Sequence, residues 1–153
     1  MSKEDERMGR ITVEVEIANL VDDGNAREGR LPPERVRKTT VTALVDTGAS
    51  ILVLPEDLVE QLGLPVLRHA RTRLGDGRVV DCTIHSGAKL TVMRRAVTTD
   101  VLKAPRGVPV LLGKIPLGGL DLHIDPRNQR LIPNPEAPDP ETVMVDLYAA
   151  ARL

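Results

Sequence analysis

The chain has 153 residues, of which 41% are hydrophobic and 28% are charged, and its formal net charge at pH 7 is -1. This length predicts one globular domain with a core of its own, and the near-neutral charge excludes a basic surface for nucleic acid. No apolar run approaches the roughly 20 residues of a membrane-spanning helix, so we expect no membrane partner. The charged first ten residues predict no signal peptide, and the lone Cys82 forms no internal disulfide, so we expect a cytoplasmic protein.

Two strands and a connecting loop are predicted in the N-terminal third. Apolar and polar residues alternate from Ile11 to Ile17, which is typical of a half-buried strand. Residues 21–33 are rich in Asp, Gly, Asn and Arg, so we expect a long exposed loop there. A second strand is predicted over residues 36–45. Because tyrosine occurs once and phenylalanine and tryptophan are absent, aliphatic residues must fill the core, and the β-branched ones favour strands.

A short strand and a helix follow. Residues 51–54 are all apolar and predict a buried strand. Pro55 suits the first position of a helix, and the acidic residues after it match the helix dipole. Gly63 provides the stop signal, so the helix is predicted to end just before it.

The middle of the chain predicts a hairpin and further strands. Residues 72–80 contain two runs that flank Gly-Asp-Gly, and such a tip tolerates positive φ. The outgoing strand is expected to continue to residue 84. A separate strand is predicted at residues 90–92 and another at residues 97–102.

The C-terminal third begins with an apolar segment, residues 108–112, that ends at Gly113. In the segment 114–119 a proline and two glycines weaken any helix. Residues 120–132 alternate, turn at Asp-Pro-Arg-Asn and alternate again, which predicts a second hairpin.

These elements predict an all-β domain, closed on itself, with one or two short helices. We assign the domain to residues 9–133 and expect residues 1–8 to be disordered. Residues 134–153 are expected to form a Pro-rich, extended tail, because prolines prevent regular pairing. Whether residues 143–147 add a strand or pack on a partner stays open.

The stretch from Ala43 to Ser50 contains Asp46-Thr47-Gly48 between two hydrophobic runs. A carboxylate at the end of an apolar strand is costly unless it is hydrogen-bonded or useful. Asp-Thr-Gly also suits a plain turn between strands. The flanking runs and the motifs that follow favour a catalytic carboxylate over a turn residue.

Three features occur in the chain order seen in retropepsin-like aspartic proteases: residues 43–50, the Gly-Asp-Gly hairpin and Leu111-Leu112-Gly113. Over residues 8–135 the chain resembles the bacterial branch of this clan AA group. The resemblance implies a closed retropepsin-like acid-protease barrel. The chain departs from the retroviral pattern at residues 114–119, where Pro116 and two glycines stand in place of a short helix.

The resemblance also implies a role for each motif. Asp46 would activate water, and Thr47, Gly48 and Ala49 would complete the active-site loop. The flap, which would close over an extended peptide or protein substrate, consists of Gly75, Asp76 and Gly77. Loop support would come from Leu111, Leu112 and Gly113. Neither a metal nor another cofactor is implied.

Two carboxylates that share one proton can serve as both base and acid in peptide hydrolysis, as in aspartic proteases. The chain contains one Asp-Thr-Gly, so the simplest completion is a homodimer with one Asp46 from each subunit. The sequence therefore predicts an aspartic endopeptidase; the alternative is a non-catalytic dimerisation or peptide-binding module with the same fold. Ala49 offers no hydroxyl to favour the charged carboxylate, so we expect an activity optimum nearer neutral than strongly acidic pH.

Other reactive side chains have plainer interpretations. The three histidines lack metal-ligand spacing and are predicted at surfaces or edges: His69, His85 and His123. Cys82 is predicted to be a small core residue, and Arg94-Arg95 a charge pair on a solvated face.

Overall fold

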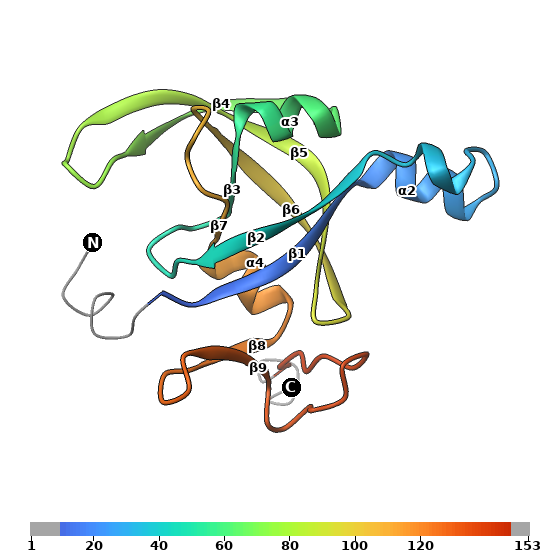
Figure 1. The fold of residues 1–153 in the computed structure, drawn as a ribbon, viewed down its shortest axis with the longest axis vertical. Helices are drawn as coiled ribbons and strands as arrows, with labels where there is room; N and C mark the ends of the chain where they lie inside the picture. Colours follow the sequence, from blue (N-terminus) through green and yellow to red (C-terminus); the bar gives the residue numbers. More distant parts are fainter. Residues whose placement is uncertain (1–9, 148–153) are drawn as a thin grey trace.

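The computed structural model describes residues 10–147, in which strands predominate (Figure 1). Seven strands form one sheet and two form a second sheet, as the sequence predicted for a mainly β protein. The strands are β1 Thr12–Asn19, β2 Lys38–Val45, β3 Leu52–Pro55, β4 Val66–Arg73, β5 Val79–Val92, β6 Arg95–Ala104, β7 Leu111–Leu112, β8 Leu122–Asp125 and β9 Arg130–Pro133. The helices are α2 Leu20–Arg27, the short 3-10 helix η1 Pro33–Arg35, α3 Glu56–Leu62 and α4 Lys114–Gly119. None of these helices has the length and apolarity to span a membrane.

The order of the large sheet is β1-β2-β7-β3-β6-β5-β4, and β1 also pairs with β5. The extra pairing joins six strands in a cycle, while β4 pairs with β5 alone. A closed barrel requires such a cycle. Closure itself stays a prediction.

The core is aliphatic, as expected for a chain with one tyrosine and no phenylalanine or tryptophan. Strand β3 is buried along its whole length, between β6 and β7 and against α3. The largest fully buried aliphatic side chains are Ile17, Leu52, Leu54, Leu62, Leu90, Leu112 and Leu120. Helix α3 ends as predicted, because Gly63 adopts the left-handed conformation at φ 63°.

The two strands expected between residues 80 and 92 are one long strand, β5. Its pairing with β6 shifts register between His85 and Ala88, and Gly87 between them has a φ of 83°. A polar residue followed by glycine therefore marks a bulge here and not a turn. The bulge lets β5 pair with β4 at one end and with β1 at the other.

The expectation of a loop over residues 21–33 is wrong, because helix α2 occupies most of it. Asn19 caps the helix: its side chain accepts a hydrogen bond from Asp22 N at 3.0 Å and donates to Leu62 O at 2.9 Å. Asp22 in turn accepts from Arg37 Nε at 2.8 Å and Nη2 at 3.1 Å. The polar residues around the start of this segment thus have structural roles: Asn19 caps the helix, and Asp22 forms an ion pair with Arg37.

Asp22→Asn is expected to lower the melting temperature at neutral pH by about 2–4 °C. The Arg37 side chain and backbone donate to this carboxylate and hold the pKa of Asp22 below its ordinary value. Its stabilising effect is therefore complete above the ordinary value, near pH 4, and is lost as the pH falls through the folded value. Melting curves of both proteins across this range should converge in acid; a difference that is constant with pH would contradict the assignment.

Residues 114–119 form helix α4, although their proline and two glycines lower the helix propensity of this segment. Pro116 is tolerated because it lies in the first turn, where its missing N–H has no helical partner. Gly119 is required by packing, because a side chain there would lie 2.8 Å from Val97 Cγ2 of β6. The glycine that argued against a helix in isolation thus permits its close contact with the sheet.

The prediction that Arg95 lies on a solvated face is wrong, because Arg95 is only 3% exposed. Its guanidinium nitrogens lie 2.6–3.1 Å from six backbone carbonyl oxygens, which share its five N–H donors. The acceptors are Leu120, Asp121, Ala137, Asp139, Pro140 and Thr142. Arg95 therefore holds the segment that follows β9 against its own subunit.

This segment has no regular strand within residues 134–147, so the strand considered for residues 143–147 does not form there. Asp121 adds to its attachment by accepting from Asn134 Nδ2 at 3.1 Å and from Met144 N at 2.8 Å. The hydrogen bond from Met144, with smaller effects of Asn134 and Arg95, lowers the pKa of Asp121. The division of the chain at residue 133 stays a prediction.

Candidate active site

The loop that carries Asp46 connects β2 to β3 and lies over the end of β7. Strand β7 sits between these two strands, parallel to β2 and antiparallel to β3. Asp46 N donates to Leu112 O at 3.0 Å, and Leu44 N donates to Val110 O at 2.8 Å. The position of Asp46 is thus set by a strand that lies far away in the sequence.

Gly113 fits against the same loop without room for a side chain. Lys114 N donates to Ala49 O at 3.0 Å and Ile115 N donates to Ser50 O at 2.9 Å. A Cβ at Gly113 would overlap Ile51 O and lie 2.8 Å from Ala49 O. These are backbone atoms that cannot rotate away, so the start of α4 and the Asp46 loop form one tightly packed unit.

Gly113→Ala is expected to destabilise the protein by about 1–3 kcal/mol, the usual cost of overpacking. The matched control is Gly118→Ala in helix α4, which Gly113 precedes as the N-cap, and nothing lies within 4 Å of a Cβ added at Gly118. Urea unfolding of both variants measures the difference. Equal midpoints for the two would contradict the packing of Gly113 against the loop.

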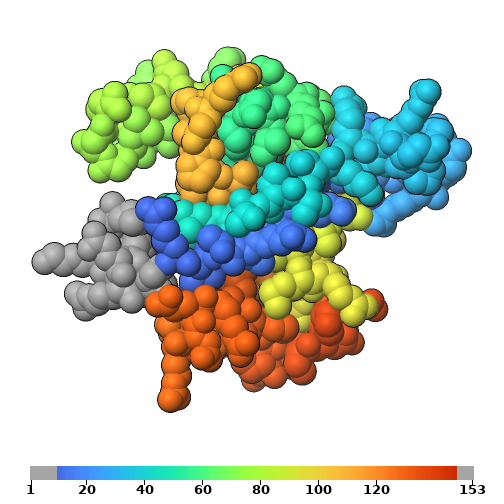
Figure 2. Space-filling view, viewed as in Figure 1, coloured from blue at the N-terminus to red at the C-terminus, as the bar shows by residue number. Residues whose placement is uncertain are grey.

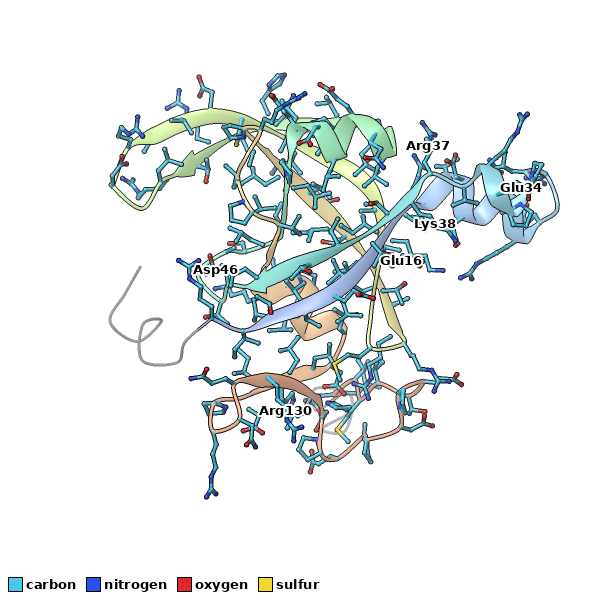
Figure 3. The ribbon with its side chains drawn as sticks, in the orientation of Figure 1. Glu16, Glu34, Arg37, Lys38, Asp46 and Arg130 are labelled. Atoms are coloured by element: carbon cyan, nitrogen blue, oxygen red, sulfur yellow. The ribbon has the colours of Figure 1, made fainter. Side chains whose placement is uncertain are left out.

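Asp46 is a half-buried residue at the end of its strand (Figure 3). Gly48 N donates to Oδ1 at 2.9 Å, and Ala49 N closes the turn by donating to Asp46 O at 3.1 Å. Oδ2 accepts no hydrogen bond from residues 10–147, and no second carboxylate of this part of the chain bonds to Asp46. One oxygen is thus oriented by the backbone, while the other can bind water or share a proton with another acid.

The hairpin predicted at Gly75–Gly77 joins β4 to β5. Leu74 N donates to Arg78 O at 2.8 Å, and Gly77 has a φ of 88°. Asp76 accepts from Arg78 N at 3.0 Å and from Arg78 Nε at 2.7 Å, and these bonds lower the pKa of Asp76. Asp76 therefore stabilises the tip itself.

Figure 2 shows this hairpin projecting as a separate lobe from the body of the molecule. Its tip and the Asp46 loop extend toward the same side of the fold (Figure 1). No hydrogen bond joins the tip to the loop among the residues described. The structure thus brings residues 46–49 together with residues 111–113, and leaves residues 75–77 apart from both.

Two other predictions need correction. His85 is buried, with Nδ1 2.8 Å from Leu64 O and Nε2 3.0 Å from Thr83 Oγ1, so it is a satisfied structural residue. His69 and His123 are exposed, as predicted. Cys82 is half-buried on β5 of the hairpin and does not belong to the core, although burial raises the pKa of its thiol.

Ile115 is a residue that the sequence analysis missed. It follows the Asp46-loop contact at the start of α4, and its side chain is 62% exposed. The sequence analysis expected no stable helix over residues 114–119, and therefore it did not place Ile115 beside the Asp46 loop. An exposed isoleucine here gives the surface where α4 meets the Asp46 loop an apolar character.

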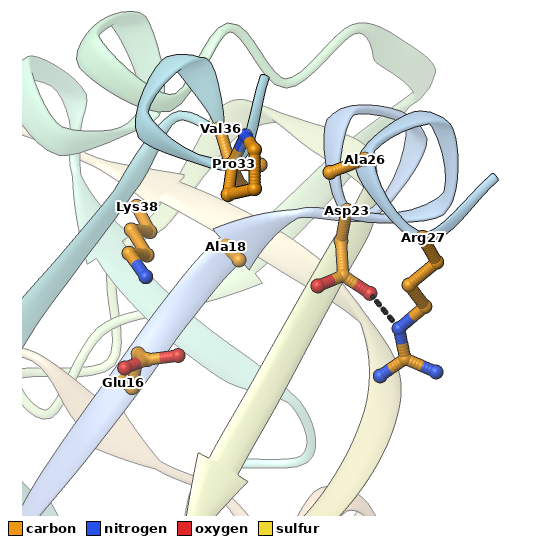
Figure 4. A pocket seen from close by; sticks show the side chains of 8 residues that line it. All are labelled: Glu16, Ala18, Asp23, Ala26, Arg27, Pro33, Val36 and Lys38. Atoms are coloured by element: carbon orange, nitrogen blue, oxygen red, sulfur yellow. Dashed lines mark ion pairs between the residues drawn. The ribbon is translucent and has the colours of Figure 1, made fainter. Parts of the chain in front are cut away.

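A shallow groove of about 250 Å³ lies between α2 and the strands β1 and β2 (Figure 4). Its lining residues are Glu16, Ala18, Asp23, Ala26, Arg27, Pro33, Val36 and Lys38. Asp23 pairs there with Arg27 at 3.0 Å and with Lys89 at 3.2 Å. Figure 3 shows this groove and Asp46 at different ends of the fold. Within residues 10–147 no three His, Cys, Asp or Glu side chains are grouped as metal ligands.

The part of the chain that includes the Asp46 loop, the hairpin and β7 matches a known family. The model of the family described as aspartyl protease matches residues 33–114. This span is 82 of the 153 residues, more than half of the chain. A comparison with curated proteins gave no match.

Proposed function

The chain belongs to the aspartyl protease family, and from this membership we propose that it is an aspartic endopeptidase that acts as a homodimer. The observation that supports this most is the state of the Asp46 carboxylate. Its Oδ1 is held by Gly48 N, while its Oδ2 accepts no bond from the residues described. Such a carboxylate is prepared for a partner that this part of the chain does not provide.

In the proposed dimer the two Asp46 carboxylates face each other across the two-fold axis and share one proton. The ionised carboxylate takes a proton from water as the water oxygen attacks the scissile carbonyl carbon. The protonated carboxylate donates its proton to the carbonyl oxygen. When the tetrahedral intermediate collapses, the C–N bond breaks and the newly protonated carboxylate gives its proton to the leaving nitrogen. One hydroxyl of the intermediate returns its proton to the other, ionised carboxylate, which restores the shared proton.

The surrounding residues support this chemistry by position. The backbone N–H of Gly48 orients the carboxylate, and exposed Thr47 is available to brace the second subunit. Gly113 keeps the loop fixed against β7 and α4. A fixed carboxylate needs no reorganisation during the reaction, which lowers its barrier.

Substrate would bind as an extended strand under the β4–β5 hairpin, which acts as the flap. One face of the hairpin combines Ala70 opposite Cys82 with Thr72 opposite Val80, all half-buried. With exposed Ile115 beside the Asp46 loop, this small and apolar surface favours hydrophobic side chains next to the cut.

The proposal is tested by incubating the purified chain with a peptide library from acid to neutral pH. We expect cuts within peptides, between hydrophobic residues, and a specific activity that rises with protein concentration as the dimer forms. The optimum should lie nearer neutral pH, since Ala49 carries no hydroxyl; a peak well below about pH 4 would contradict that part. Binding of the peptides without cleavage at any pH would instead identify a peptide-binding module.

A further inference from the structure

Among residues 10–147, strand β4 is the free edge of the large sheet, and it carries a row of basic side chains. It pairs with β5 on one side only, so alternate backbone N–H and C=O groups on its other side have no strand partner in this part of the chain. Its exposed basic side chains are Arg68, His69, Arg71 and Arg73, and the strand contains no acid. Unpaired backbone groups thus lie beside concentrated positive charge.

The acids of the same hairpin leave this charge largely unmatched. Residues 66–81 hold four arginines and two aspartates, a formal charge of +2 in a chain whose total is -1. Arg71 pairs with Asp81 at 3.3 Å, with both side chains more than three-quarters exposed. Exposed pairs of this kind contribute little and exchange easily with other partners. Arg68 and Arg73 have no ion pair within residues 10–147.

The pairing register sorts these basic side chains onto the faces of the hairpin. His69 lies opposite Thr83, Arg71 opposite Asp81 and Arg73 opposite Val79, so the three basic residues share one face. At the start of the strand, Val66 and Leu67 are 55% and 51% exposed, where the register shifts. The edge therefore presents backbone groups, an apolar end and a basic face.

We propose that β4 is a docking edge for an acidic, extended segment of a protein substrate, which adds to the sheet as a further strand. An added strand gains main-chain hydrogen bonds, and opposite charges across a strand pair stabilise it. A second copy of β4 would place arginine against arginine, which is unfavourable. The basic edge thus discriminates against self-pairing while it selects an acidic partner.

Docking at β4 would hold the substrate on the element that closes over the site. Strand β4 leads directly into the tip at residues 74–78, so a segment bound there is tethered beside the flap. Such tethering raises the effective concentration of the cleavable segment. The inference rests on the proposed function only in naming the partner as a substrate, since docking itself requires no cleavage.

The binding test uses Asp46→Asn protein and a fluorescent peptide of alternating Val and Glu, followed by anisotropy. We expect affinity to fall as salt rises, and Arg71→Glu/Arg73→Glu to weaken it about tenfold or more. Melting curves show whether the Arg71→Glu/Arg73→Glu variant is folded. If it is not, the milder Arg71→Gln/Arg73→Gln variant replaces it in the binding test. Arg127→Glu/Arg130→Glu changes the net charge equally on the β8–β9 hairpin and should leave binding unchanged.

Several results would overturn the proposal. Equal affinity of the β4 variants and the parent, or an equal loss in the β8–β9 control, would refute docking at this edge. A peptide N-methylated at every residue cannot donate to the strand from either edge, so undiminished binding of that peptide would refute strand addition.

A cleavage test separates this inference from the proposed function. In the active protein, a Glu-rich extension on a cleavable apolar peptide should lower KM relative to a Gln-rich extension, and Arg71→Gln/Arg73→Gln should remove that gain. Cleavage of the short peptide without an extension, measured in each protein, is the reference against which that gain is expressed. If no peptide is cut, the proposed function fails, while the anisotropy result still decides whether acidic segments dock on β4.

Discussion

Replacing Asp46 by asparagine is expected to reduce peptide cleavage at least about a thousandfold, within the range that acid–base groups contribute. The amide cannot take a proton from water or share one with its symmetry mate. Asparagine keeps the volume and the side-chain oxygen that accepts from Gly48 N, so the loop should remain in place. Initial rates on one peptide, measured for both proteins at equal concentration, give the ratio.

The matched control for this variant is Asp125→Asn on the β8–β9 hairpin. Asp125 accepts from Asn128 Nδ2 at 2.8 Å and lies outside the proposed site, so its loss should leave much of the rate intact. Sedimentation should show the Asp46 variant to be as dimeric as the parent. Retention of most activity in Asp46→Asn would refute the catalytic assignment of this residue.

Arg95→Met is expected to lower the free energy of unfolding by about 3–5 kcal/mol, as when a buried charged hydrogen-bonding group is lost. Six carbonyls would lose their donor, and they lie in segments 120–121 and 137–142. The segment after β9 should separate from the domain. Denaturant unfolding measures the energy, and limited proteolysis after residue 133 detects the release.

Arg94→Met is the matched control. Arg94 is adjacent, but its ion pair with Glu141 leaves both side chains 71% exposed, so its loss should cost less than about 1 kcal/mol. Arg95→Lys retains the charge but not the planar fork that reaches several carbonyls, and should recover only part of the loss. Equal effects of the Arg94 and Arg95 substitutions would contradict the structural role of Arg95.

The sequence predicted the elements whose signals are local. Gly63 ends α3, Gly-Asp-Gly forms the tip of the first hairpin, and the alternation over residues 120–132 gives the second. In each case the residues that define the turn are neighbours in the chain. The Asp46 loop and its contact with residues 111–113 followed from a resemblance, and the catalytic roles given to these residues stay predictions.

The features that the sequence analysis missed depend on contacts with residues that are distant in the chain. Helix α2 is capped by Asn19, whose side chain also donates to Leu62 O, 43 residues away. Helix α4 requires Gly119 to pack on Val97, and Arg95 becomes buried only when the chain returns after β9. Neither propensity nor periodicity records such contacts, since each considers a short window of the chain.

The predictions about the origin and the cellular location of the protein do not depend on its fold. A bacterial origin of the branch and a cytoplasmic location rest on the resemblance and the composition, and they stay predictions. The dimer is the part on which the chemistry depends, because a single Asp-Thr-Gly provides half of a carboxylate dyad.

Mixing wild-type and Asp46→Asn subunits tests this dependence most directly. After full exchange of an equal mixture, about a quarter of the dimers carry two Asp46 carboxylates, by random pairing across one two-fold interface. The account predicts that activity, relative to wild type at the same total concentration, falls to that quarter. Retention of about half would identify a site complete within one subunit, and about three-quarters a dimer that needs only one carboxylate; either result would contradict the shared dyad.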